Sequence, residues 1–517
     1  MRKLMKKRMI TGVFVLGIFI CMLDTTIMNV SLPNIGLHLE VGLDKLSWAL
    51  NIYIILFAAL TIPLTRLAEF FGMSKGFLLG AIVFGIGSII SAFAGTLMPL
   101  LLGRAIQSIG AGLVFPLAMT LAIRIVADRD RTHMIAILGV TQGLAAALGP
   151  TIGGVVTQYM GWRWIFLINV PIIVLMISMG LLYLPLRQDI QNRQSIDLSG
   201  AIFSTIFLST LSLVLMQGRV WGWHNWLTYL CAIVSLLSFI FFIMIERVSI
   251  NPMVPLQLFK NRAFALSAII IVFSNLFLVA TTVILPNYFT NVAGMDTLQA
   301  SFLIAPISFS VFIFAPIAGF AKSHISVRWL LSSGFLMMAV GYLWLGINAL
   351  QSVWQVIIAG ILIGSGYGMI TGPILVIAAG TLQGKLLTAS QSVTGVLRQV
   401  GIMLAVALFV TGLYSGLTQA QRHANSYAQE QINDLHLPKK DAAEMIQKVQ
   451  TKMKASVFTP TAMQGLPTKV ATAISRIEKE TTAQYRHAFE KLYLIAIPFM
   501  LLLVIMSLFL TDKSEGV

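Results

Sequence analysis

Charged side chains are scarce in this sequence. Asp, Glu, Lys and Arg make up 10% of its 517 residues, whereas about a quarter of the residues in a soluble domain are charged. Hydrophobic residues make up 57%. A soluble protein of this length needs a polar shell, and so few charges cannot build one. The composition therefore excludes a soluble globular protein and places the chain in a membrane.

Cysteine and histidine are also rare. The two cysteines, Cys21 and Cys231, lie in separate apolar stretches, so they predict neither a disulfide framework nor a metal site. The seven histidines are scattered along the chain. An enzyme would need a nucleophile next to a base, or a metal cluster, and the sequence indicates neither. We therefore expect no enzymatic activity, no metal and no cofactor.

Long apolar stretches fill the chain instead. A membrane-spanning helix needs about 20 mostly apolar residues. The stretches that meet this length are 11–34, 47–65, 76–95, 98–123, 134–158, 164–184, 197–217, 226–245, 263–289, 298–321, 328–348, 353–378, 386–415 and 490–510. The first one follows five cations, as in a signal peptide, but it contains Asp24 and Asn29 and lacks a convincing cleavage site. We expect it to be retained as the first of fourteen helices.

The formal net charge of +16 has a distribution that argues against nucleic acid as a partner. With the N-terminus in the cytoplasm, the short cytoplasmic segments hold 19 Lys and Arg, and the short outer loops hold three, Lys45, Arg163 and Arg219. Cytoplasmic loops of membrane proteins carry such an excess of Lys and Arg. We predict a multi-pass protein of the inner or plasma membrane, with both termini in the cytoplasm.

A faint internal repeat indicates two halves. The segments Pro63–Lys75 and Pro316–Arg328 follow the second and tenth spans, and each runs from a proline to a cation twelve residues later. Repeated halves with a binding site between them are typical of secondary transporters. We predict an all-α polytopic fold with two six-helix halves and two extra central helices. The predicted domains are an N-terminal half at 1–196, the extra helices at 197–246 and a C-terminal half at 263–517.

One long polar segment, 416–489, interrupts the C-terminal half and is predicted to lie outside the cell. Helical spacing in 435–457 and 468–492, with prolines as breaks, predicts a helical hairpin over the outer face. Composition leaves open whether this hairpin gates the protein, recruits a partner or caps the bundle.

Three ionisable side chains lie well inside the predicted spans: Asp24, Arg104 and Arg398. Such a residue costs about 2.5–3.5 kcal/mol on insertion scales and is a candidate functional site. Asp24 and Arg104 both fall in the outer half of their helices, within reach of each other if those helices pack together. A carboxylate beside an arginine stays ionised, and a desolvated one without the arginine takes up a proton. We therefore predict that this pair couples to protons; a static ion pair is the alternative.

Further polar residues within the spans are candidates for lining a central substrate cavity. They are Thr25, Asn29, Gln107, Gln142, Asn275, Gln391, Arg398 and Gln399. Any one of them could instead form a hydrogen bond between neighbouring helices.

Four sequence motifs resemble those of a known family. The run LDTTIMNVSLP at 23–33 resembles the first-helix motif of the fourteen-helix drug:proton antiporters of the major facilitator superfamily (QacA/EmrB type). The run RAIQSIG at 104–110 is similar to the arginine motif of their fourth helix, and GLAAALGPTIGG at 143–154 to the antiporter motif of their fifth. The run GWRWIFLINVP at 161–171 also resembles this family. The motifs occur in the family's order, and the resemblance extends over the whole chain.

The antiporter motif also agrees with simple helix geometry. Gly149, Gly153 and Gly154 allow another helix to approach closely. Pro150 frees a backbone carbonyl and permits a bend.

The loop after the second span departs from the family pattern. The family usually has Gly-x-Leu-Ala-Asp-Arg-x-Gly-Arg, whereas this chain has TRLAEFFGM at 65–73. Arg66, Glu69 and Gly72 are the candidate gating residues, but the leading glycine and both arginines of the pattern are missing. The resemblance implies a loop that closes the cytoplasmic side, so the departure predicts a latch that is weaker or built differently. Harmless sequence drift is the alternative.

These observations predict a monomeric, proton-coupled antiporter that exports amphiphilic or hydrophobic compounds, as multidrug efflux proteins do, by alternating access. Its expected partners are a small amphiphilic substrate, protons and the lipid bilayer, and a periplasmic adaptor protein is left open. An exporter of one dedicated lipid or fatty-acid-like substrate is an alternative. A non-transporting membrane receptor or scaffold, using segment 416–489 to bind a partner, is an alternative of a different class.

Overall fold

The computed structural model describes residues 2–186, 197–322, 324–347, 349–380, 382–435 and 468–510. In these ranges the chain forms α1 (Arg2–Leu39), α2 (Leu43–Phe71), α3 (Met73–Ala92), α4 (Leu97–Ile125), α5 (Asp128–Met160), α6 (Trp164–Leu167), α7 (Asn169–Tyr183), α8 (Leu198–Trp221), α9 (Trp226–Val248), α10 (Gln257–Lys260), α11 (Arg262–Asn291), α12 (Thr297–Ala321), α13 (Val327–Gly346), α14 (Val353–Ala379), α15 (Gly384–Ala405), α16 (Thr411–Asn433) and α18 (Thr468–Leu508). Fourteen helical segments of this part of the chain are long and apolar enough to cross a membrane, which confirms the predicted number.

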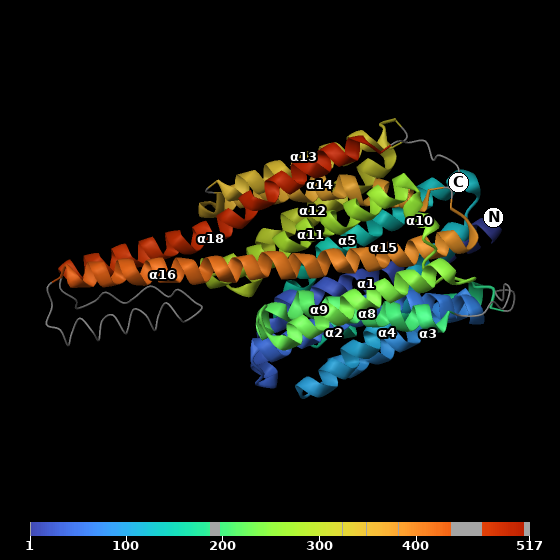
Figure 1. Cartoon of the computed structure of the whole chain (residues 1–517), viewed down its shortest axis with the longest axis horizontal. Coiled ribbons are helices and arrows are strands. Elements are labelled where there is room, and N and C mark those ends of the chain that lie inside the picture. The colour runs from blue at the N-terminus through green and yellow to red at the C-terminus, as the bar shows by residue number, and fades with distance from the viewer. Residues whose placement is uncertain are drawn as a thin grey trace.

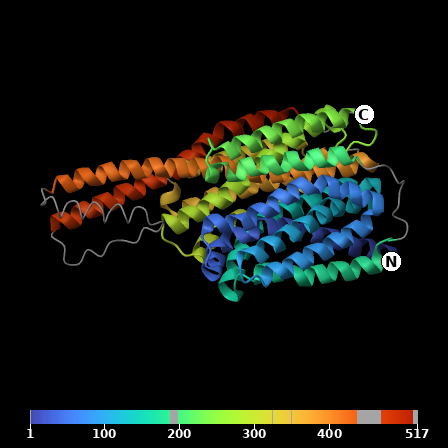
Figure 2. The same ribbon diagram turned by 60° about the horizontal axis from the view of Figure 1, so that its bottom comes forward.

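The helices form two halves with the same internal packing. In the N-terminal half, α4 packs against α2 and α3, and α1 packs against α5. In the C-terminal half, α14 packs against α12 and α13, and α11 packs against α15. The first, second, third, fourth and fifth spans of each half therefore have equivalent neighbours. Figure 2 shows the two halves side by side.

The interface between the halves repeats the same symmetry. Helix α5 packs against α12 and α14 of the other half, and its equivalent α15 packs against α2 and α4. The two extra helices, α8 and α9, pack against each other, and α8 also lies on α2. The fold is therefore an all-α membrane protein with two six-helix halves and two added helices, as predicted.

Two predicted spans differ in detail from single helices. The sixth, predicted at 164–184, consists of α6 and α7 in succession. The thirteenth, predicted to end at residue 415, continues through one π-helical turn, η2 (Val406–Val410), into α16, and the helix ends only at Asn433. No proline follows Gly416 until Pro438, and Gln and Ala are good helix formers. The chain therefore stays helical beyond the apolar span.

Helices α16 and α18 pack against each other and project beyond the bundle as a hairpin (Figure 1). Ala420, Ala424 and Ala428 recur at every fourth position on the buried face of α16, as an antiparallel helix pair requires. The predicted helix at 468–492 is the first part of α18, which continues into the last span. Of the other predicted helix, 435–457, all but the first residue lies outside the described residues.

The bundle has two distinct ends. Helix α1 begins, and α18 finishes, at the end opposite the projecting hairpin (Figure 1). We call this the terminal end, and the other the hairpin end. The predicted orientation places the terminal end in the cytoplasm.

Candidate functional site

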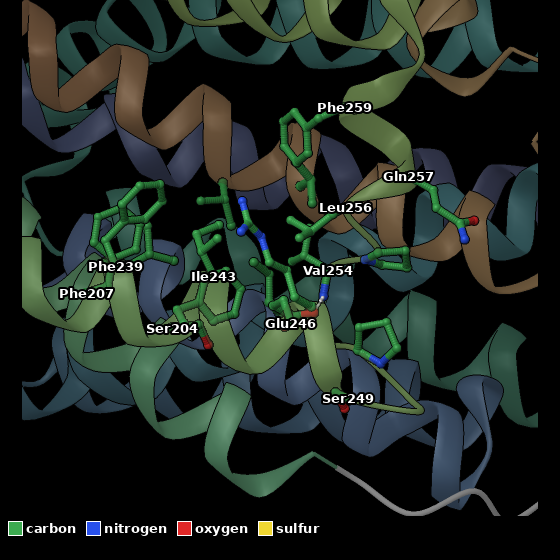
Figure 3. Close-up of a pocket in the computed structure, with 18 of the residues that line it drawn as sticks. Ser204, Phe207, Phe239, Ile243, Glu246, Ser249, Val254, Leu256, Gln257 and Phe259 are labelled. Atoms are coloured by element: carbon green, nitrogen blue, oxygen red, sulfur yellow. Dashed lines mark hydrogen bonds between the residues drawn. The ribbon is translucent and has the colours of Figure 1, made fainter.

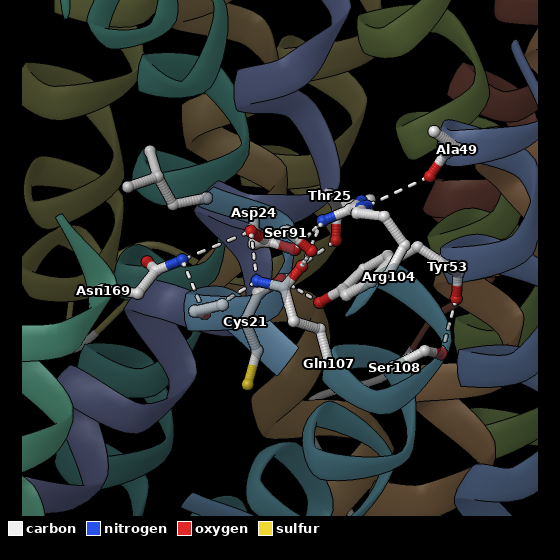
Figure 4. Close-up of polar contacts among 12 residues, drawn as sticks. Cys21, Asp24, Thr25, Ala49, Tyr53, Ser91, Arg104, Gln107, Ser108 and Asn169 are labelled. Atoms are coloured by element: carbon white, nitrogen blue, oxygen red, sulfur yellow. Dashed lines mark hydrogen bonds and ion pairs between the residues drawn. The ribbon is translucent and has the colours of Figure 1, made fainter. Parts of the chain in front are cut away.

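Asp24 and Arg104 meet inside the N-terminal half, as the sequence predicted they could (Figure 4). Asp24 on α1 and Arg104 on α4 form an ion pair, and their exposed fractions are 1% and 0%. The Nε of Arg104 donates to the carbonyl oxygen of Ala49 at 3.0 Å, and its guanidinium lies 4.2 Å from the ring centroid of Tyr53. Both of these contacts are on α2, so the arginine holds α1, α2 and α4 together.

Two amide side chains complete the surroundings of the carboxylate. Gln107 on α4 donates to Asp24 Oδ1 at 3.3 Å and to Ser88 Oγ at 2.8 Å. Asn169 on α7 donates to the same two side chains at 3.3 and 3.4 Å. A buried ion pair is stable only when its remaining polar atoms are also satisfied, and these amides do this for Asp24.

From the sequence, Gln107 is a candidate for lining a central cavity. The structure places it in the network around Asp24 instead. Asn169 was missed as a site residue. A signal was available, because this amide lies in the most apolar of the fourteen spans, with a mean hydropathy of 2.6, where an unpartnered amide would be costly.

A cavity of about 300 Å³ opens at the hairpin end between the two halves. Its lining includes Thr25 and Asn29 on α1, both predicted, together with Asn51 on α2 and Thr282 on α11. Asp24 is not part of this lining, although it directly precedes Thr25 in the chain. In this conformation the ion pair therefore does not border the cavity.

A second polar network lies in the C-terminal half. The hydroxyl of Tyr367 on α14 donates to Asn275 Oδ1 on α11 at 3.0 Å. Arg398 on α15 donates from Nη1 to the same hydroxyl at 3.4 Å. The structure thus brings two predicted residues, Asn275 and Arg398, together through a tyrosine that the sequence analysis did not single out.

The remaining predicted polar residues are buried but lie apart from these networks. Gln142 on α5 donates to Met119 Sδ at 3.0 Å, and Gln391 on α15 donates to Ser390 Oγ at 3.1 Å. Both amide atoms of Gln399 are buried without a hydrogen-bond partner among the described residues.

The glycines predicted to form the antiporter motif lie at helix contacts. A Cβ added at Gly149 or Gly153 would collide with α1, where the nearest atom to Gly153 is the carbonyl oxygen of Ile27. A Cβ at Gly154 would collide with α12. Helix α5 continues through Pro150 without a break. This motif therefore packs the fifth span against both the first span and the opposite half.

The candidate gating residues lie at the terminal end, with Arg66 and Glu69 in the last turns of α2 and Gly72 directly after it. Arg66 and Glu69 form an ion pair at 2.7 Å. Arg66 also donates to the carbonyl oxygens of Pro252 and Met253, both at 3.1 Å, in the segment between α9 and α10. Gly72 has φ 111°, which favours glycine, and joins α2 to α3. The loop is thus fastened to the segment after the extra helices by an arginine outside the family pattern.

Two buried carboxylates were missed because they lie at the edges of predicted spans. Glu246, at the end of α9, accepts backbone N–H bonds of 3.0 and 3.2 Å from Met253 and Val254. Glu490, within α18, contacts His487 Nδ1 at 2.8 Å. Both helices extend further than their apolar cores, so these acids lie in the bundle rather than in loops.

Comparison with known proteins agrees with this architecture. Residues 14–406 match the sequence profile of the Major Facilitator Superfamily. The chain is 30% identical over 340 residues to the probable multidrug resistance protein EmrY of Escherichia coli (strain K12), an alignment that covers 65% of this chain and 66%, just under two thirds, of the relative. It is 31% identical to the multidrug export protein EmrB of the same strain, over 64% of each chain.

It is also 25% identical over 529 residues to the multidrug transporter protein MdtP of Bacillus subtilis (strain 168), covering 98% of this chain and 94% of the relative. Multi-pass membrane helices, two repeated halves and a profile match over most of the chain lead to one assignment. The chain is a member of the major facilitator superfamily.

Proposed function

We propose that this protein exports amphiphilic or hydrophobic compounds across the cell membrane in exchange for protons that enter. Membership of the superfamily supports transport, and the names of the relatives support multidrug efflux. The observation that carries proton exchange is the buried Asp24–Arg104 ion pair, because ionisable side chains within membrane-spanning helices are costly and are candidate functional sites by default.

The exchange follows because the ionised and the protonated forms of the Asp24 carboxyl group are stabilised by different surroundings. Next to Arg104 and the two amide donors, the carboxylate of Asp24 has a counter-charge and hydrogen-bond donors. When α1 and α4 separate, the desolvated carboxylate loses its counter-charge and takes up a proton. Thr25, the next residue, already lines the hairpin-end cavity. Adjacent residues lie about 100° apart around a helix axis, so Asp24 reaches this cavity when the helices around it separate. In the predicted orientation, that cavity supplies the proton from outside.

The substrate binds between the halves, where alternating access can expose it to either side. The hairpin-end cavity combines hydroxyl and amide groups with apolar residues such as Val279 and Ile402, a lining suited to amphiphiles. Its volume of about 300 Å³ is at the lower end of the range of ligand pockets. A larger compound therefore requires the halves to open further.

A dedicated lipid-like or fatty-acid-like anion is the second candidate substrate. Arg398 favours it, because this guanidinium is 2% exposed and its partner in the described part of the chain is the neutral hydroxyl of Tyr367. A buried cation without a carboxylate partner favours an anionic group nearby.

The test is substrate-dependent proton movement in liposomes that contain only this protein, with a pH-sensitive dye inside and an imposed proton gradient. Cationic, neutral and lipid-like anionic compounds are compared. We expect at least one class to drive proton movement in the wild type, and Asp24→Asn to abolish it. Glu40→Gln, which removes an exposed acid just after α1, is the matched control and should behave as the wild type.

Proton movement at the wild-type rate in Asp24→Asn would overturn the role of Asp24. If no compound class moves protons through the wild type, the antiporter proposal fails and a receptor or scaffold is favoured. Arg398→Gln separates the substrate classes, because it should reduce transport of anions and leave transport of cations in place.

A further inference from the structure

A large groove opens on the side of the bundle, away from the proposed transport site (Figure 3). The extra helices α8 and α9 form one wall, α15 forms the other, and α10 with the segment before it closes the terminal end. The volume is about 1350 Å³, whereas pockets for drug-sized ligands measure about 300–1,000 Å³. Neither the Asp24–Arg104 pair nor any residue of the hairpin-end cavity belongs to its lining.

The walls of the groove are apolar over a long distance. Phe207 on α8 and Phe239 and Ile243 on α9 face α15 across it (Figure 3). On α15 the lining runs from Leu386 to Val400, a length of about 21 Å at 1.5 Å per residue. One leaflet of a bilayer has about 15 Å of hydrocarbon, half of the whole core. An extended acyl chain therefore fits along this wall.

The charges of the groove are confined to its terminal end. Arg247 on α9, Lys260 on α10 and Lys385 on α15 are exposed there and come from three separate elements. The acid in the lining, Glu246, accepts two backbone N–H bonds from the segment before α10, at 3.0 and 3.2 Å. The carboxylate of Glu246 is thus bonded to the protein backbone. Within the described ranges no ion pair includes Arg247, Lys260 or Lys385, so these cations can face a ligand.

We propose that the groove binds an anionic phospholipid of the leaflet at the terminal end. Its acyl chains lie between α15 and the extra helices, and its phosphate lies against Arg247, Lys260 and Lys385. The apolar walls extend over the depth of one leaflet and match the acyl chains of such a lipid. The cations at the leaflet surface match its phosphate. The predicted orientation supports this occupant, because the cytoplasmic leaflet contains anionic lipids that attract Lys and Arg.

The bound lipid also has a structural consequence. Ile62 on α2 belongs to the lining together with α15 residues of the other half. The lipid therefore contacts both halves and the extra helices at once.

The test uses the full chain in detergent micelles and two photoactivatable probes with identical acyl chains, phosphatidylglycerol and phosphatidylcholine. We expect phosphatidylglycerol to label the protein about tenfold more, because each cation near an anionic headgroup strengthens binding several-fold. The labelled peptides should come from α8, α9, α10 and α15. Equal labelling by both lipids, or adducts confined to other helices, would overturn the proposal.

Variants sharpen the result. The triple substitution Arg247→Gln, Lys260→Gln, Lys385→Gln should reduce phosphatidylglycerol labelling to the phosphatidylcholine level. The matched control is Lys6→Gln, Lys7→Gln, Arg8→Gln, which removes the same charge from exposed positions at the same end and should keep the labelling.

Leu211→Trp, which fills the apolar wall, should reduce labelling by both lipids. An equal loss in the two triple variants would show nonspecific attraction and contradict the site. Size-exclusion profiles verify that each variant is folded. The comparison of the two lipids on the wild-type protein does not depend on any variant. The labelling experiment measures no transport. A negative labelling result therefore leaves the proposed transport function unaffected, and a negative transport result leaves the lipid site unaffected.

Discussion

The two halves place polar groups on equivalent helices but give them different charges. In the N-terminal half, the first and fourth spans contribute Asp24 and Arg104, a buried ion pair. In the C-terminal half, the first and fourth spans contribute Asn275 and Tyr367, a neutral pair with a 3.0 Å hydrogen bond. The charge in that half, Arg398, comes from the next long helix. The repeat thus preserves the helix packing, while the carboxylate–arginine pair between the first and fourth spans occurs in the N-terminal half alone.

This difference determines how much stability each network loses when a substitution removes one of its side chains. A buried carboxylate and guanidinium stabilise the protein only together, since either one alone is an uncompensated charge. A buried amide or hydroxyl that loses its partner costs less. We therefore expect the N-terminal network to be the more fragile and the more responsive to protonation, and the C-terminal network to be the more tolerant.

The largest expected effect comes from breaking the ion pair. Arg104→Met leaves Asp24 among amide donors without a counter-charge, which should lower the free energy of unfolding by about 3–5 kcal/mol. Chemical unfolding in detergent micelles measures this loss. The double variant Asp24→Asn, Arg104→Met makes the N-terminal half as neutral as the Asn275–Tyr367 pair, and it should regain most of the stability. A double variant as unstable as the single one would show that packing of the arginine, rather than its charge, dominates.

A smaller effect should appear in both halves, because it depends on packing they share. Gly153 on α5 lies against the Ile27 carbonyl of α1, and Gly401 on α15 lies against the Val272 carbonyl of α11. An alanine at either position would overpack a close contact with backbone, at a cost of typically 1–3 kcal/mol. Gly12→Ala, with no atom within 4 Å of its added Cβ, is the control and should be neutral or slightly stabilising. Destabilisation by Gly153→Ala alone would contradict the equivalence of the two contacts.

Much of the fold could be predicted because apolar length and charge asymmetry are properties of the chain itself. The fourteen spans, the two halves and the Asp24–Arg104 pair could be predicted from these properties. The direction in which a polar side chain points could not be predicted from them. Gln107 lies one helical turn from Arg104, so its face was known, but whether that face met a cavity or a carboxylate depended on the neighbouring helices.

Long-range partners were also beyond the sequence. Tyr367 was inconspicuous because a tyrosine fits any span, and its role appears only once α11, α14 and α15 are placed together. Arg66 reaches carbonyl groups 186 and 187 residues away, and no local pattern indicates that contact. The end of the thirteenth helix was predicted too early. The length of the apolar stretch indicates where the chain leaves the membrane, whereas helix propensity decides where the helix ends.

The last expected effect is the removal of one hydroxyl from the C-terminal network. Tyr367→Phe deletes the group that joins Arg398 to Asn275 and should lower the free energy of unfolding by about 1–3 kcal/mol, because two hydrogen bonds are lost and one of them is made by a charged group. Unfolding in micelles measures it, with Tyr159→Phe at a position 73% exposed as the control. A loss as large as that of Arg104→Met would mean that Arg398 depends on this hydroxyl as Arg104 depends on Asp24. The two halves would then be equally fragile, and the contrast between the ion pair of the N-terminal half and the neutral Asn275–Tyr367 pair of the C-terminal half would not hold.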